Sequence, residues 1–156
     1  MAKEIERKYK VVGDAFKKEA TKSIHIKQAY LVSSEEGCTV RVRMADEVAF
    51  LTLKSSSSCT GLVRNEWEYS IPFQDAEEMI KGSTIIEKER FLVPYKEHLW
   101  EVDCFSGFLD GLVIAEVELH KEDEMVSLPP WVGEEVTGKR AYYNAVLAQE
   151  GLPSPN

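Results

Sequence analysis

Like charges recur two residues apart along this chain, in segments that otherwise alternate polar and apolar residues. The acidic pairs are Glu4 with Glu6, Glu66 with Glu68 and Glu116 with Glu118, and the basic pairs are Arg41 with Arg43 and Lys88 with Arg90. In an extended strand, two such residues lie on the same face, roughly 7 Å apart. Paired carboxylates offer the hard oxygen ligands that Mg²⁺ and Mn²⁺ prefer, and paired bases form charge-assisted hydrogen bonds with phosphate oxygens. The pattern therefore predicts a site for a metal–polyphosphate complex.

The simplest alternative is an antiparallel sheet with one face in water, which explains any single one of these strands. A solvated face gains from mixed signs, however, because like charges that lie close together are mildly destabilising. Here the acidic pairs and the basic pairs occupy separate strands. We therefore expect the strands to close into a barrel that points its charged faces inward and leaves its apolar faces outside.

The order of strands and turns predicts an α+β fold, mainly β, in which an eight-stranded antiparallel β-barrel has a charged interior and helices packed outside. Strands are expected near residues 3–12, 23–32, 38–45, 47–54, 62–71, 84–93, 98–105 and 112–120, with a hairpin loop from Ser55 to Gly61. Helices are expected after Gly13-Asp14, over 74–81 and over 139–150. No repeat or linker interrupts the sequence, so residues 1–156 are expected to form one domain.

The composition predicts a cytoplasmic protein that binds neither nucleic acid nor membranes. Asp and Glu number 27 against 19 Lys and Arg, a net charge of −8, whereas broad binding of nucleic acid or of an anionic membrane needs a basic face. Cys38, Cys59 and Cys104 are widely spaced, which favours reduced thiols over a disulfide framework or a zinc site. The N-terminus lacks the apolar region of a signal peptide, and no apolar run approaches the ~20 residues of a membrane span.

The glycine-rich phosphate-binding loop G-x-x-x-x-G-K-[ST] does not occur in the sequence. Phosphates would therefore be held by side chains on strands. No serine or cysteine stands in a recognisable nucleophile motif, so direct attack by water on phosphorus is simpler than covalent catalysis.

Near its N-terminus the chain carries the motif E-x-E-x-K, formed by Glu4, Glu6 and Lys8. Further motifs follow in order over nearly the whole chain: IKQAYL with Lys27, TVRVR, LTLK, R-x-E-x-E from Arg64 to Glu68, EKERF, WEVDCF, AEVEL and VTGKRAYYNAVLA. Together they resemble the CYTH, or triphosphate tunnel metalloenzyme, superfamily, and they are most similar to its short, single-domain bacterial members. The resemblance implies a barrel forming a tunnel that binds a triphosphate together with Mg²⁺ or Mn²⁺.

The resemblance also implies roles for individual residues. The activating metal would be held by Glu4, Glu6 and Glu118, with Glu116 close by. Glu66 and Glu68 would hold a second metal or place the attacking water. The phosphate chain would be bound by Lys27, Arg41, Arg43, Arg64, Lys88 and Arg90. Lys8 and Lys54 would flank the reacting phosphoryl group and orient water, or take its proton if cationic neighbours depress their pKa values.

Four further residues belong to the margins of the implied site. Asp103 lies on the charged face of its strand and is expected to line the tunnel. Tyr30 is expected either to touch substrate or water or to serve as packing. Lys139 and Arg140 would either close the tunnel mouth from the C-terminal helix or lie on the surface at the start of that helix.

The function implied by the resemblance is metal-dependent hydrolysis of a triphosphate, with water attacking the terminal phosphorus in line. Because so charged a tunnel offers little to recognise a base or a sugar, inorganic tripolyphosphate is the first expected substrate, cleaved to pyrophosphate and phosphate. The alternatives are a class IV adenylyl cyclase that converts ATP to cyclic AMP, a thiamine triphosphatase, and a non-catalytic polyphosphate-binding module. The full set of acidic metal ligands argues against the last. The exposed faces of the barrel, together with the resemblance to this family, suggest a homodimer.

Overall fold

Strands are the main elements of the computed structural model, which describes residues 2–34, 38–55 and 62–154. In chain order the elements are β1 (Ala2–Val11), α1 (Phe16–Glu19), β2 (Lys22–Ser33), β3 (Thr39–Ala45), β4 (Val48–Lys54), β5 (Val63–Ile71), α2 (Phe73–Met79), β6 (Ile86–Tyr95), β7 (His98–Phe105), the 3₁₀ turn η1 (Gly107–Leu109), β8 (Val113–Glu118), β9 (Val132–Glu135), the 3₁₀ turn η2 (Arg140–Tyr142) and α3 (Asn144–Glu150). Beyond Ser55, the predicted hairpin loop lies outside the described residues. None of the described helices is long and apolar enough to cross a membrane.

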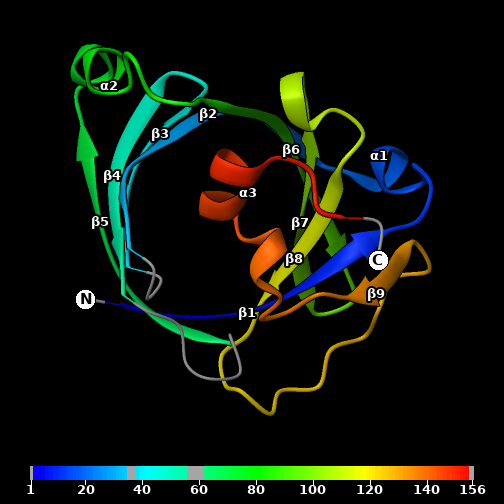
Figure 1. The fold of residues 1–156 in the computed structure, drawn as a ribbon. Helices are drawn as coiled ribbons and strands as arrows, with labels where there is room; N and C mark the ends of the chain where they lie inside the picture. Colours follow the sequence, from blue (N-terminus) through cyan, green and yellow to red (C-terminus); the bar gives the residue numbers. More distant parts are fainter. Residues whose placement is uncertain (1, 35–37, 56–61, 155–156) are drawn as a thin grey trace.

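Antiparallel pairing closes eight of the strands into a barrel (Figure 1). Neighbouring strands follow the order β5-β4-β3-β2-β6-β7-β8-β1-β9, and the pairing of β1 with β5 closes the ring. The predicted fold class is confirmed. The short strand β9 is absent from the sequence-based prediction; it lies beside the second half of β1, where Tyr9 pairs with Glu135.

Much of the apolar packing that stabilises the barrel lies outside its wall. Tyr9, Trp100 and Trp131 form an outer aromatic cluster with Phe16 of α1, and none of the four is more than 3% exposed. The Trp131 ring lies 5.8 Å from the rings of both Phe16 and Trp100, measured between centroids. Because successive residues of a strand face opposite sides, this outward placement of the apolar residues turns the charged ones toward the barrel interior.

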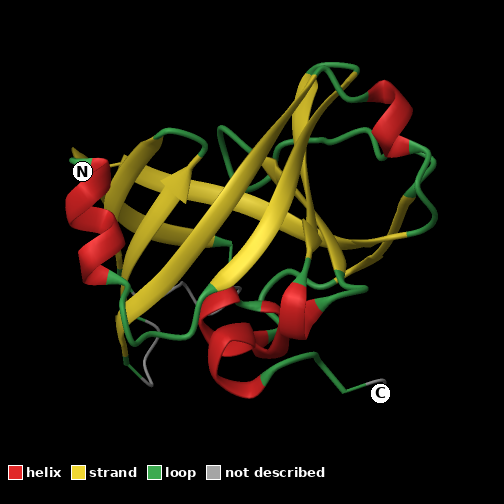
Figure 2. Ribbon diagram, turned by 90° about the horizontal axis from the view of Figure 1, so that it is seen from above, coloured by secondary structure: helices red, strands yellow, loops and turns green. Residues whose placement is uncertain are grey.

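The helices occupy two kinds of place. α1 and α2 pack on the outside of the wall, and Ala76 of α2 and Ile80 just after it pack against β2, β3 and β4. By contrast, α3 lies across one end of the barrel (Figures 1 and 2), where Leu147 packs against Ile86 at the start of β6. The helix expected from residue 139 is divided, because the extended backbone of Tyr143 (φ −69°, ψ 134°) separates η2 from α3.

Replacing Phe16 by alanine should lower the free energy of unfolding by about 3–5 kcal/mol, because it empties a fully buried aromatic position. Phe16 is 1% exposed, whereas Phe108 in η1 is 48% exposed and serves as the matched control. Urea unfolding followed by tryptophan fluorescence measures both. A Phe16→Ala variant as stable as Phe108→Ala would mean that the outer aromatic cluster does not stabilise the fold.

Candidate active site

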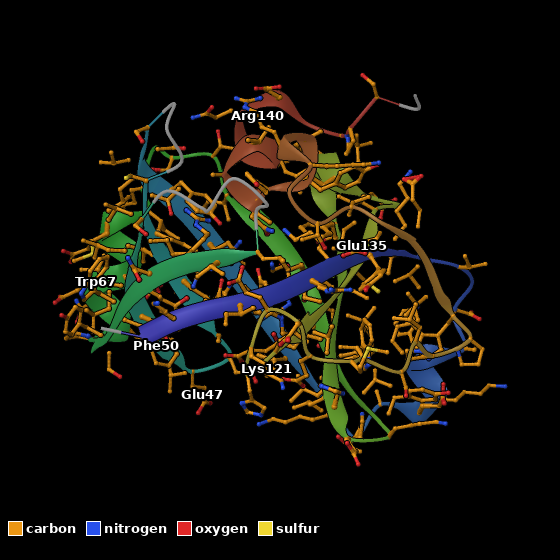
Figure 3. All side chains as sticks on the ribbon, turned by 90° about the horizontal axis from the view of Figure 1, so that it is seen from below. Glu47, Phe50, Trp67, Lys121, Glu135 and Arg140 are labelled. Atoms are coloured by element: carbon orange, nitrogen blue, oxygen red, sulfur yellow. The ribbon has the colours of Figure 1, made fainter. Side chains whose placement is uncertain are left out.

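A cavity of about 520 Å³ lies inside the barrel. Its wall includes most of the predicted site residues: Glu4, Glu6, Lys8, Tyr30, Arg41, Arg43, Lys54, Arg64, Glu66, Glu68, Lys88, Arg90, Glu116, Glu118 and Arg140. The carboxylates come from β1, β5 and β8, and β7 adds Glu101. Strands β3 and β6 supply four cations, called the basic wall below: Arg41, Arg43, Lys88 and Arg90. Figure 3 shows Arg140 beside α3, at the end of the barrel away from Glu47 and Phe50.

Three predicted residues do not line the cavity. Lys27 is exposed on the outer face of β2, because side chains alternate along the strand and Gln28 takes the inward position, so the structure does not bring Lys27 together with the other predicted phosphate ligands. Lys139 is also exposed, with Nζ 3.4 Å from Glu134, and lies on the surface, which was one of the two placements expected for it, and not at the cavity mouth. Asp103 is 1% exposed and lies behind the wall of the cavity.

Asp103 is the buried counter-ion of the basic wall. Arg90 donates from Nε and Nη2 to its two oxygens at 2.8 and 2.9 Å, and Nζ of Lys88 lies 2.8 Å from Oδ2. Burial would raise the pKa of Asp103, but Arg90 and Lys88 lower it well below its ordinary value. The ionised carboxylate therefore fixes both cations of β6 in place.

The positive charge of the basic wall is only partly compensated. Burial, followed by the neighbouring Arg41 and Arg90, lowers the pKa of Arg43 to about 9, although a guanidinium stays protonated at neutral pH. Nε of Arg41 is buried and finds no hydrogen-bond partner in the described part of the chain. Because the cations repel one another, an anion that carries several charges would relieve the repulsion by lying among them.

Lys88 is a buried lysine of the cavity whose pKa is lowered. Burial lowers the pKa of Lys88, and Arg90 and Arg43 lower it further, to about 7, although Asp103 opposes them. A lysine with this pKa is partly neutral at physiological pH and can accept a proton.

Lys8 lies in the opposite kind of surroundings. Its Nζ is 3.6 Å from Glu116 and donates to the backbone oxygen of Tyr142 at 3.1 Å. Burial would lower the pKa of Lys8, but Glu116 and Glu6 outweigh it and raise the pKa above its ordinary value. The condition under which Lys8 was expected to take a proton, a depressed pKa, is therefore not met.

Glu4, Lys54 and Glu66 form a cluster of ion pairs on the acidic side of the cavity. Nζ of Lys54 lies 2.8 Å from Glu4 and 3.5 Å from Glu66. Burial would raise the pKa of Glu4, but Lys54 and the hydrogen bonds to Glu66 and Lys54 lower it to about 2. Burial and the neighbouring Glu4 raise the pKa of Glu66 to about 7. Glu4 is therefore ionised at neutral pH, whereas Glu66 changes charge there.

Glu6 is a carboxylate without enough positive charge around it. It lines the cavity, is otherwise enclosed by the barrel, and faces Glu118 across the pairing of β1 with β8. Burial, and then Glu116 and Glu4, raise the pKa of Glu6 well above its ordinary value, although Lys54 and Lys8 oppose this. A cation beside Glu6 would relieve this unfavourable charge.

The donors around Glu6 fit Mg²⁺ or Mn²⁺ in chemical type, because both ions prefer carboxylate oxygens. Glu6 and Glu118 face each other on adjacent strands, and Glu116 and Glu4 lie nearby on the same two strands. Within the described ranges, however, no three acidic, histidine or cysteine side chains are already gathered as a metal would hold them. Glu4 in particular is paired with Lys54, so a metal would have to compete for it.

Sequence reasoning missed several polar residues at the site. Gln28, which is fully buried, accepts a hydrogen bond from Nε of Arg43 at 2.8 Å. Thr52 donates to Glu68 at 2.9 Å and accepts from Arg41 at 3.3 Å. Both have the inward parity of their strands, a signal that could have found them. Asn144, at the start of α3, lines the cavity without any comparable signal in the sequence.

Replacing Glu6 by glutamine should stabilise the protein in EDTA, and more so at pH 8 than at pH 5. The raised pKa of Glu6 means that its contribution to stability is present below the ordinary value of 4.5 and is lost as the pH rises through the folded-state value. Glutamine stays neutral at both pH values, so the variant lacks the loss of stability that ionisation of Glu6 causes. Thermal midpoints of both proteins at the two pH values measure the difference.

The matched control for this experiment is Glu47→Gln, an exposed residue at the turn between β3 and β4 (Figure 3). Adding Mg²⁺ or Mn²⁺ should stabilise the wild type more than Glu6→Gln, since a metal bound to the native state raises its stability. If the difference in stability between wild type and Glu6→Gln is the same at both pH values, the pKa of Glu6 is not raised in the folded protein.

Comparison with known proteins gives a consistent result over almost the whole chain. The sequence model of the CYTH domain family matches residues 2–145. The chain is 41% identical over 152 residues to a protein of Acetivibrio thermocellus named inorganic triphosphatase, covering 96% of this chain and 95% of the relative. It is 35% identical over 151 residues to a protein of Nitrosomonas europaea with the same name, covering 93% and 96%.

A solved structure supports the same relationship at the level of the fold. A crystal structure described as that of an inorganic triphosphatase superimposes with a TM-score of 0.65 and 31% sequence identity. The match covers 97% of this chain and 99% of the other.

Proposed function

Because the chain belongs to the CYTH domain family, we propose that it hydrolyses inorganic tripolyphosphate to pyrophosphate and phosphate. The observation that carries this proposal is that one cavity holds both the basic wall, whose positive charge is only partly compensated, and Glu6, whose pKa is raised by burial and by neighbouring carboxylates. A polyphosphate bound to a divalent cation brings both of the missing charges in one complex. The relatives named inorganic triphosphatases support this choice of substrate.

The basic wall would bind the phosphate chain. Arg41, Arg43 and Arg90 present guanidinium groups, which keep their charge and donate strong hydrogen bonds to phosphate oxygens. Arg90 already donates to Asp103 and Glu101, so it would contribute mainly its charge and its remaining N–H bonds. Arg64 and Arg140 line the same cavity and would extend the contact. The same groups would stabilise the charge that develops on pyrophosphate as it leaves.

A divalent metal would be held by carboxylates of β1 and β8, with Glu6 and Glu118 as its first ligands and Glu4 and Glu116 beside them. When bound, Mg²⁺ or Mn²⁺ offsets the negative charge of phosphate oxygens. Glu66 and Glu68, together with Lys54, would place the attacking water or hold a second metal from the adjoining strands.

In the chemical step, the oxygen of water forms a bond to the terminal phosphorus and the bridging P–O bond breaks, leaving its electron pair on pyrophosphate. The proton of the water passes to the neutral amine of Lys88, whose pKa of about 7 suits a general base at physiological pH. This role replaces the one expected from the sequence for Lys8, whose pKa is raised.

The proposed function is tested by measuring phosphate release from tripolyphosphate, ATP and thiamine triphosphate with Mg²⁺ or Mn²⁺, with cyclic AMP measured in the ATP reaction. We expect the fastest release from tripolyphosphate, and its loss both in EDTA and in Glu6→Ala. Lys27→Ala should retain the activity, because Lys27 faces outward.

Each other result of this assay points to a different function. Cyclic AMP from ATP would indicate an adenylyl cyclase, and a strong preference for thiamine triphosphate would indicate a thiamine triphosphatase. Tight binding of tripolyphosphate without turnover of any substrate would refute the enzymatic proposal and leave a polyphosphate-binding module. Turnover that survives EDTA would refute metal dependence.

Replacing Lys88 by arginine should lower kcat about 10²- to 10⁴-fold while tripolyphosphate still binds, because arginine keeps the charge but does not accept the proton. In the wild type, kcat/KM should rise with pH through about 7 as Lys88 becomes neutral. Glu66 titrates in the same range, so the control is Glu66→Gln, which should keep this rise. A Lys88→Arg variant with the wild-type pH profile would exclude Lys88 as the base.

Three expectations from the sequence stay predictions: the cytoplasmic location, the single-domain organisation and the homodimer. Size-exclusion chromatography with light scattering would test the oligomeric state directly.

A further inference from the structure

A continuous chain of side-chain hydrogen bonds links the basic wall to the start of α3. Nε of Arg43 donates to Oε1 of Gln28 at 2.8 Å, and Nε2 of Gln28 donates to Oδ1 of Asn144 at 3.0 Å. Oδ1 of Asn144 also accepts from Nζ of Lys88 at 2.9 Å, and Nζ of Lys88 lies 2.8 Å from Asp103. The chain crosses from β3 through β2 and α3 to β6 and β7.

The chemistry of its ends dictates the direction of every bond in this chain. An arginine side chain only donates, so the amide oxygen of Gln28 has to face Arg43. The amide nitrogen of Gln28 then donates to Oδ1 of Asn144, which places that oxygen, an acceptor, beside Lys88 whatever the protonation state of the lysine. Gln28 is 0% exposed, so water offers no alternative partner if its amide turns over.

At Lys88 this arrangement uses up two directions around Nζ. A neutral amine has two N–H bonds and one lone pair. With Asp103 and Asn144 as fixed acceptors, both N–H bonds are engaged and the lone pair takes a remaining tetrahedral direction. Lys88 lines the cavity, where a water molecule lying in that direction would meet the lone pair.

The other charged groups that face Lys88 do not provide this orientation. Arg90 of β6 and Arg43 of β3 repel its ammonium form, while Glu116 of β8 attracts it. The Phe105 ring lies 5.2 Å from Nζ and offers no directional acceptor. Among the described residues, the acceptors within hydrogen-bond distance of Nζ are Asp103 and Asn144.

We propose that Asn144, held in place by Gln28, is a positioning residue that aims the lone pair of Lys88 into the cavity. The proposal rests on the proposed function, because it assigns Asn144 a part in the proton transfer of that reaction. It also makes the catalytic geometry depend on α3, since Asn144 is the first residue of that helix.

The test compares Asn144→Ala and Asn144→Asp with Asn65→Asp, a matched amide-to-carboxylate change on the outward-facing side of β5. Asn144→Ala should lower kcat about 10- to 100-fold, with KM for tripolyphosphate changed by less. Asn144→Asp keeps an acceptor but adds a negative charge that favours the ammonium form. It should shift the rise of kcat/KM to higher pH by about one unit and regain activity at alkaline pH. Asn65→Asp should match the wild type in both.

A second measurement follows the protonation of Lys88 by NMR and needs no turnover. It therefore tests the role of Asn144 separately from the proposed function. In protein labelled with ¹³C at the ε-carbon of lysine, the Lys88 signal is assigned by its loss in Lys88→Arg and titrated in the wild type and the Asn144 variants. The expected result is a raised Lys88 pKa in Asn144→Asp and an unchanged one in Asn65→Asp. Coincident titration curves in wild type and Asn144→Asp would overturn the role of Asn144. So would wild-type kcat in a folded Asn144→Ala. A wild type that titrates as expected but does not cleave tripolyphosphate would refute the proposed function alone.

Discussion

A single buried carboxylate, Asp103, makes the basic wall of the barrel sustainable. It binds Arg90 through two oxygens and Lys88 through one of them. Leaving buried charges without their partner typically costs about 3–5 kcal/mol, so without Asp103 the barrel would have to expel these cations or neutralise them. One anion does not, however, balance the whole wall. Burial and cationic neighbours lower the pKa of Arg43, and Arg41, although it lies 3.7 Å from Glu68, has a buried Nε with no hydrogen-bond partner among the described residues. The residual positive charge would favour the binding of a polyanion in the cavity.

This charged interior is tolerable because the fold does not rely on it for stability. The large aromatic side chains pack outside the wall, under α1, and a second apolar cluster lies between the wall and α2. Burial of these side chains stabilises the barrel from outside, whereas the interior carries charges such as the strained Glu6. Stability and interior charge are thereby assigned largely to opposite faces of the same strands, except at the end under α3, where Ile86, Phe105 and Ile114 form an apolar cluster with Leu147. Substitutions on one face should then have limited effect on the property provided by the other.

The alternation of residues along the strands predicts most of the residues that line the cavity, because parity decides which side chains of a barrel face inward. Arg41 and Arg43 line the cavity as their alternation predicts. Lys27 was assigned from its motif, although Gln28 has the inward parity of Tyr30 on the same strand. The part played by Asn144 could not be predicted, since no local pattern indicates where α3 docks. The lowered pKa of Lys88 likewise depends on groups from several strands that are distant in sequence.

The position of β1 in the barrel has a consequence for the order in which the molecule is built. This first strand pairs with β5 on one side for part of its length, and with β8 and β9 for the rest. A chain synthesised from its N-terminus has to hold β1 unpaired until those later strands emerge, and contacts between such distant segments form slowly. Glu6 and Glu118 therefore meet only when the ring closes. The carboxylates proposed to hold the metal are separated in the growing chain, so a nascent polypeptide would not assemble the proposed metal site before its last strands are in place.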